Sequence, residues 1–194
     1  EKIDLTGSRD SVIGATIGII IGLLAGYFHG TREYEAGVIE LALTASNLSD
    51  ALADVARPFV GTHASFVAGT RSHTQASALR DLWAPLAEAL SELETTGQDV
   101  IVDAGRLGLN GSPEPLLEAA DLSLIVSRTT LPALSALRSW ADAFQRPALD
   151  WHQAGVLLVG EGQPYGSREV TNVVNLPVVA TLSDDPESAA VFSR

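Results

Sequence analysis

The feature that most constrains the fold is a short apolar run that ends on an acidic residue and a glycine-rich bend, QDVIVDAGRLGLNG, at residues 98–111. Its β-branched part, Val100 to Val102, is bounded by turn residues, which predicts a strand buried on both faces, as in a parallel sheet between layers of helices. Asp103 directly follows this strand, at the edge where open α/β folds bind their ligands. Asp103 is therefore the first candidate functional residue, and the alternative is a turn or helix-capping carboxylate.

Apolar stretches of strand length alternate with helical stretches along most of the chain. Strands are expected at residues 64–68, 100–102, 122–126, 156–159 and 178–182, and helices at residues 34–57 with a break near Asn47, 72–97, 112–120, 131–144, 167–174 and from Asp185 onward. Because parallel strands need crossover connections, this order predicts an α/β fold, doubly wound, with a mostly parallel sheet and helices on both faces. The length suits a single α/β domain over residues 1–194.

One uncharged stretch, VIGATIGIIIGLLAGYF at residues 12–28, departs from this alternation. Glycines recur there at every fourth position, and on a helix this spacing lets another backbone approach closely. The stretch is at the lower limit of length for a membrane span, and each glycine costs about 1 kcal/mol of helix propensity. We therefore expect a closely packed, buried helix over residues 12–28. The alternative is a membrane-associated or self-associating helix whose contact face is formed by Gly14, Gly18, Gly22, Gly26 and, just beyond, Gly30.

Composition and charge exclude several classes of function. Twelve basic and twenty-four acidic side chains give a net charge of -12, and the arginines are not clustered, so direct nucleic-acid binding is not expected. The chain has no cysteine, which excludes disulfides and thiol catalysis and favours a cytoplasmic location. Its four histidines lack the spacing of a zinc-binding pair, so no zinc site is expected. It also has no methionine, so a chain that begins at Glu1 is expected to be a processed or excised piece, truncated at both ends.

Two arginines follow predicted strand ends at the same edge as Asp103. Arg106 and Arg128 could each offer a guanidinium group to a phosphate or to a carboxylate of a partner protein. The alternative for each arginine is a surface ion pair. Asp184 and Asp185, by contrast, are expected to form a turn and the start of a helix.

The order of these segments resembles the MinD and ParA-like ATPases, the deviant Walker-A group of P-loop proteins, and especially the alanine- and arginine-rich members from high-GC actinobacteria. The resemblance is carried by QDVIVDAGRLG, EAADLSLIVSRTTLPALSALRSWADAF, GVLLVGEGQPYGSREV and NLPVVATLSDDPESAAVF, and it covers about residues 64–192. It implies a nucleotide-dependent positioning or assembly switch, such as those of chromosome partitioning. The resemblance further implies a cytoplasmic homodimer, or a complex with another protein, with membrane contact left open.

The resemblance also implies a site. Asp103 matches the Walker B aspartate, which orients magnesium through water, and Gly105 and Gly108 match the switch that follows it. Asp4 is similar to the switch I aspartate of the family. The implied catalytic residues are thus Asp4 and Asp103, and the implied ATP and magnesium contacts are Asp103, Gly105 and Gly108, with Arg128 added as the candidate guanidinium.

The chain departs from the family at two positions that matter for chemistry. The only lysine is Lys2, so the glycine-lysine phosphate loop is missing, and the family pattern would place that loop before Glu1. Gly160 and Glu161 stand where the family has an asparagine that recognises adenine. We therefore expect a catalytically incompetent chain, either truncated or a degenerate relative that works through protein contacts. The alternatives are a non-enzymatic interaction module built on residues 12–28, or a different Rossmann-like enzyme with a small-molecule ligand at the same edge.

Overall fold

The computed structural model describes residues 19–21, 37–44, 47–58, 63–70, 75, 77–106, 112–144 and 154–187. These residues belong to two compact units, residues 1–116 and residues 117–194. Each unit is described by itself below, and the expectation of a single domain over residues 1–194 stays a prediction. No helix in the described ranges is both long enough and apolar enough to cross a membrane.

The first unit contains a four-stranded sheet in the order β2-β3-β1-β4. Its strands are β1 (Ile19–Ile21), β2 (Arg57–Pro58), β3 (Ser65–Val67) and β4 (Val100–Val102). β1 runs parallel to both β3 and β4, whereas β2 is antiparallel to β3. At the end of β1, Ile21 pairs with Val67 on one side and with Val102 on the other. The chain therefore leaves β1, β3 and β4 at the same edge of the sheet.

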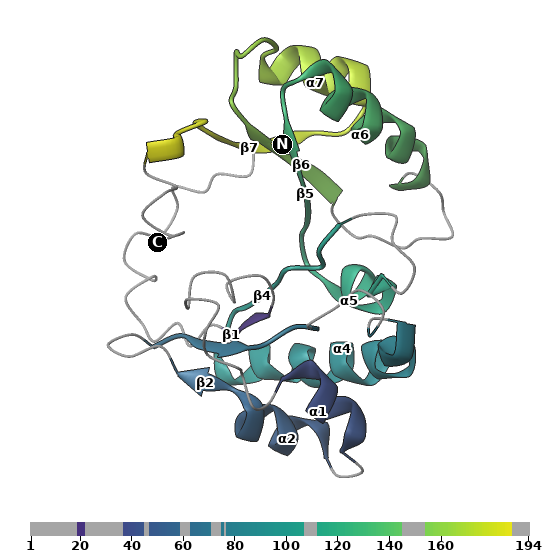
Figure 1. The fold of residues 1–194 in the computed structure, drawn as a ribbon, viewed down its shortest axis with the longest axis vertical. Coiled ribbons are helices and arrows are strands. Elements are labelled where there is room, and N and C mark those ends of the chain that lie inside the picture. Colours follow the sequence, from purple (N-terminus) through teal and green to yellow (C-terminus); the bar gives the residue numbers. More distant parts are fainter. Residues whose placement is uncertain are drawn as a thin grey trace. The chain divides into compact units, whose positions relative to one another are not determined.

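Helices of the first unit pack beside this sheet (Figure 1). Asn47 accepts a hydrogen bond from the Ser49 N–H at 3.1 Å and caps the second helix, which confirms the helix break expected near Asn47. Gly97 adopts a left-handed φ of 74° and ends the last helical turn before β4. The elements are α1 (Val38–Leu43), α2 (Leu48–Val55), the 3-10 segment η2 (Ser77–Leu82), α4 (Trp83–Glu92) and η3 (Leu93–Thr96).

The core of the first unit lies between these helices and one face of the sheet. Leu41, Leu52 and Leu86 are almost fully buried there, and Val100 and Val102 of β4 pack against the same cluster. Trp83 is only 8% exposed in this core, and among the described residues its indole N–H has no hydrogen-bond acceptor.

The prediction that the strand at residues 100–102 is buried on both faces is wrong for Ile101, which is 62% exposed. Successive side chains of a strand point to opposite faces of a sheet. The helices of the first unit cover the face that carries Val100 and Val102, so Ile101 points away from that core.

The predicted helix over residues 12–28 is also wrong where the structure describes it, because Ile19–Ile21 form strand β1. Three consecutive β-branched residues favour an extended backbone, and the glycines that flank them are poor helix formers. The remainder of the stretch, including Gly14, Gly18, Gly22 and Gly26, lies outside the described residues.

The second unit contains a three-stranded parallel sheet in the order β5-β6-β7. Helices α6 and α7 lie side by side, with α6 against β5 and α7 against β7 (Figure 1). The strands are β5 (Ser123–Arg128), β6 (Ala154–Val159) and β7 (Val178–Leu182). The helices are α6 (Leu131–Phe144) and α7 (Ser167–Val174). Helix α5 (Glu114–Ala119) precedes them and spans the boundary between the two units in the sequence.

The register between β6 and β7 contains one irregularity. Val156 pairs with Val178, but Leu157 pairs with Ala180, so Val179 is an extra residue in β7. Gly155 lies opposite this bulge, and a Cβ built on it would be 2.2 Å from the Cγ2 of Val179. The bulge is thus accommodated because position 155 has no side chain.

Candidate ligand sites at the carboxyl edges of the two sheets

The sheet of the first unit has a topological switch point. From β1 the chain proceeds to β3 on one side, and it then crosses to β4 on the other side. Open α/β sheets bind ligands outside the carboxyl ends of strands at such a point. Asp103 follows Val102 directly, and Val102 pairs with Ile21, so Asp103 lies at the switch point beside the end of β1.

A tight turn fixes the backbone around Asp103. Its Oδ1 accepts a hydrogen bond from the Gly105 N–H at 2.8 Å, an arrangement that closes an Asx turn. Gly105 has a φ of 76°, a conformation that glycine adopts without strain. Both residues are exposed, so the carboxylate stands at the sheet edge in contact with solvent.

The other residues predicted from the sequence are distributed as follows. Asp4 and Gly108 lie outside the described residues, and Arg106 is exposed in the bend after Gly105. Arg128 is the last residue of β5 in the second unit, where its Nη1 lies 3.5 Å from Asp184 Oδ2. The structure therefore brings Asp103 together with Gly105, and it pairs Arg128 with Asp184 in a surface ion pair.

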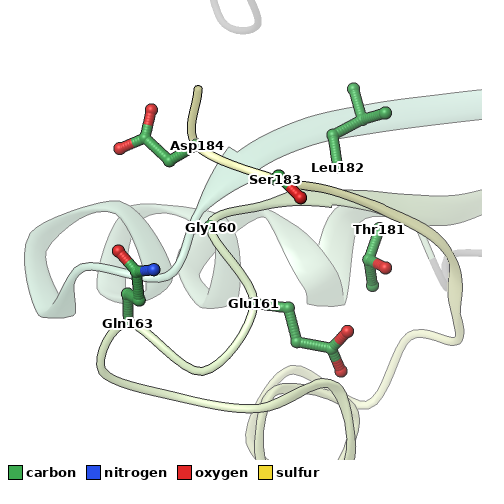
Figure 2. A pocket seen from close by; sticks show the side chains of 7 residues that line it. All are labelled: Gly160, Glu161, Gln163, Thr181, Leu182, Ser183 and Asp184. Atoms are coloured by element: carbon green, nitrogen blue, oxygen red, sulfur yellow. The ribbon is translucent and has the colours of Figure 1, made fainter. Parts of the chain in front are cut away.

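The second unit contains a pocket of about 250 Å³ at the carboxyl ends of β6 and β7 (Figure 2). Asp184 and Gln163 lie on one side of Gly160, and the Glu161 side chain extends on the side of Thr181. Its lining is Gly160, Glu161, Gln163, Thr181, Leu182, Ser183 and Asp184.

The loop that follows β6 forms much of this pocket. Gly160 and Gly162 have left-handed φ values of 79° and 77°, so this path needs glycine at both positions. The Gly160 N–H donates to Leu182 O at 2.8 Å, and the Gln163 N–H donates to Gly160 O at 3.0 Å. The loop is thus joined to the end of β7 and folded back on itself.

Thr129 lies beneath this loop, one residue after β5. Its side chain is only 1% exposed. The hydroxyl Oγ1 lies 2.9 Å from Gly160 O and also contacts Gln163 O. A buried polar group directly after β5 therefore supports the loop from inside the protein.

Glu161 connects the pocket to the start of α7. Its Oε1 accepts hydrogen bonds from the Ser167 hydroxyl and from the Ser167 N–H, the latter at 3.2 Å. These bonds, the hydroxyl first, lower the pKa of the Glu161 carboxyl below its ordinary value of 4.5, with a smaller contribution from the Thr181 hydroxyl. Glu169 caps the same helix end by accepting the Gly166 N–H at 2.9 Å. The carboxylate of Glu161 is therefore ionised at neutral pH and held in place.

The chemistry of the pocket is that of a polar, acceptor-rich site. Glu161 and Asp184 only accept hydrogen bonds when ionised, whereas the amide of Gln163 can both donate and accept. Such a lining suits a ligand group that donates hydrogen bonds, for example the exocyclic amino group of a purine base. Within the described ranges, no cluster of three or more histidine, aspartate or glutamate side chains is arranged to hold a metal ion.

Sequence reasoning missed Thr129 and the pocket, and it assigned Asp184 only to a turn. One signal was present in the sequence, because Ser127, Arg128 and Thr129 are consecutive polar residues at the end of an apolar strand. Polar residues at the carboxyl end of a parallel strand are typical of ligand sites.

These features define a class, the open and mostly parallel α/β proteins whose ligand sites lie at the carboxyl edges of the strands. No protein-family model matches the chain, and no curated protein matches its sequence. Solved structures do match. A ParA family ATPase from Chlorobium tepidum TLS superimposes with a TM-score of 0.70 at 15% identity, over 93% of this chain and 75% of that chain.

Two further structures have the same fold. The MinD cell division protein of Aquifex aeolicus gives a TM-score of 0.65 at 9% identity, over 95% of this chain and 76% of that chain. Apo McdA of Cyanothece gives a TM-score of 0.68 at 12% identity, over 93% of this chain and 79% of that chain. The predicted fold class, an α/β fold with mostly parallel strands flanked by helices, is thereby confirmed.

Proposed function

We propose that the chain is a nucleotide-responsive positioning or assembly switch related to the ParA and MinD ATPases. The observation that carries this proposal is the position of Asp103. Asp103 follows β4 beside the end of β1, at the switch point of the first sheet. The fold of the chain matches solved structures of a ParA family ATPase and of MinD. The switch point is where such folds bind their ligands.

The proposed ligand at this edge is ATP with magnesium. Magnesium prefers oxygen ligands and keeps several waters, so an exposed carboxylate such as Asp103 fits a contact through water. When bound, magnesium would neutralise charge on the phosphates. Gly105 and Gly108 would give the backbone room to approach the nucleotide, and Asp4 would serve as a second carboxylate.

The residues of the chain fit the metal better than they fit the phosphates. The sequence that follows β1 is GLLAGYFHGTREYEAG, which contains glycines but no lysine. P-loop ATPases use a lysine in their phosphate loop to stabilise the β- and γ-phosphates during transfer, and the only lysine of this sequence is Lys2. We therefore propose that the chain is catalytically incompetent and responds to nucleotide by binding alone.

The second unit supports the proposal independently. Its pocket presents acceptors that suit the amino group of a purine, although Arg128 is paired with Asp184 instead of standing ready for a phosphate. As a switch, the chain would act through a second copy of itself or another protein in the cytoplasm, with peripheral membrane contact as a further proposal. Its net charge of -12 argues against direct binding to nucleic acid.

Two measurements on the purified chain test the proposal. Isothermal titration with ATP and magnesium should show binding that Asp103→Ala weakens, because the metal contact is lost. Release of phosphate from ATP should stay at the level of a protein-free control. Magnesium-dependent phosphate release that disappears in Asp103→Ala would refute the incompetence, and the absence of any nucleotide binding would refute the switch.

A further inference from the structure

We propose that Thr129 is a positioning residue whose buried hydroxyl presets the loop from Gly160 to Gln163 and thereby keeps the pocket of the second unit formed before any ligand arrives. The identity of the ligand rests on the proposed function, but the preset loop does not.

The first argument is the number of protons available. A hydroxyl group has one proton to donate, yet Thr129 Oγ1 contacts two carbonyl oxygens, those of Gly160 and Gln163. Gly160 O already receives the Gln163 N–H at 3.0 Å. We therefore infer that the Thr129 hydroxyl donates its proton to Gln163 O. Each of the two carbonyl oxygens at this turn then accepts one hydrogen bond.

The second argument is the intrinsic freedom of the loop. Gly160 and Gly162 both adopt positive φ values, and glycine has many alternative conformations of similar energy. A loop of this composition needs contacts from outside to keep one conformation, because fixing each residue costs about 1–2 kcal/mol of entropy. Thr129 supplies such a contact from the end of a strand, which is a rigid element.

The third argument is burial. Arg128, the neighbour of Thr129, also reaches the pocket through Asp184, but the arginine side chain of that pair is 66% exposed. Exposed ion pairs contribute little to order or stability. The Thr129 hydroxyl is enclosed and its contact with Gln163 O is partly buried, so water replaces this hydrogen bond less easily than it replaces an exposed ion pair, and the threonine restrains the loop more strongly.

The test compares the full chain carrying Thr129→Val, which removes the hydroxyl at nearly constant shape, with Thr129→Ser, which keeps it. Amide hydrogen exchange without ligand should accelerate roughly five- to tenfold in the Gly160–Gln163 loop of Thr129→Val, as the loss of one ordinary hydrogen bond produces. Thr129→Ser should stay close to wild type. Thr95→Val is the matched control, because it removes an exposed hydroxyl that donates to Glu92 O at 2.7 Å in the first unit.

Binding of fluorescent ATP, measured in parallel, should weaken in Thr129→Val by a similar factor and recover in Thr129→Ser. The inference is overturned if loop exchange in Thr129→Val equals that of wild type, or if Thr129→Ser behaves like Thr129→Val. A wild-type chain that binds no nucleotide refutes the proposed function, and in that case the exchange rates alone still support or overturn the role of Thr129.

Discussion

Adding one methyl group at Gly155 should destabilise the chain through a single steric contact. An alanine Cβ at this position would lie 2.2 Å from Val179 Cγ2, about 1.3 Å inside the closest ordinary carbon separation of about 3.5 Å. Valine is stiff about χ1, so its methyl group cannot simply turn away. The clash must be relieved by an off-rotamer side chain or by a shift of β7 against β6.

The expected magnitude follows from two terms. Overpacking a well-packed site costs about 1–3 kcal/mol. Replacing glycine by alanine also reduces the entropy of the unfolded chain, which returns about 0.4–1 kcal/mol. The net loss in the free energy of unfolding for Gly155→Ala should be about 1–2 kcal/mol, which corresponds to about 2–8 °C in the melting temperature for a chain of this length.

Urea unfolding followed by circular dichroism measures this loss, with an unchanged slope as the sign that the denatured state is unaffected. The double variant Gly155→Ala with Val179→Ala should recover part of the stability, because the second change removes the clashing methyl group. The coupling between the two changes should be at least about 0.5 kcal/mol. Gly97→Ala serves as the control, since it strains a φ of 74° without a clash in the described structure and should be additive with Val179→Ala.

A Gly155→Ala chain as stable as wild type would refute the clash itself. A destabilised Gly155→Ala chain that Val179→Ala fails to rescue would show that the cost arises elsewhere in the strand.

Gly37→Ala should cost about 1–3 kcal/mol in urea unfolding, because its Cβ would lie 2.5 Å from the backbone oxygen of Ala68, which side-chain rotation cannot move. Asp103→Asn should shift the melting temperature by less than about 2 °C, because the amide keeps the turn acceptor at an exposed site, and a larger loss would reveal a structural carboxylate. Ser167 lowers the folded pKa of Glu161 below 4.5, so this carboxylate stabilises the fold fully above pH 4.5 and progressively less as the pH falls through the lower folded pKa. The difference in melting temperature between wild type and Glu161→Gln should therefore vanish in that acidic window, and a difference that persists there would contradict the assignment.

Most of the strands and helices could be predicted from the sequence, because their hydrophobic spacing is local. The strand at residues 178–182 and the helix at residues 167–174 have the predicted bounds, and β4 matches the apolar run before Asp103. Asp103 could be placed at a sheet edge for the same reason, since a residue that follows a parallel strand must lie there.

Strand β1 could not be predicted in this way. The four-residue spacing of the glycines around it suggested a helix, whereas the state of Ile19–Ile21 depends on pairing with strands near residues 65 and 100. The pocket could not be predicted from the sequence for a similar reason. Thr129 contacts carbonyls that are 31 and 34 residues further along the chain, and no local pattern encodes such a contact.

Burial of Trp83 has a consequence for observing the two units separately. It is the single tryptophan of residues 1–116, whereas Trp140 and Trp151 belong to residues 117–194. An indole enclosed by aliphatic side chains emits at shorter wavelength than one in water, so Trp83 is an intrinsic optical probe of the first unit. Replacing Trp140 and Trp151 by phenylalanine would leave an emission spectrum that reports on the core around Leu86 alone. Comparing its melting temperature with the circular dichroism melt of the same variant, which reports on both units, would reveal whether the two units melt at one temperature or at two.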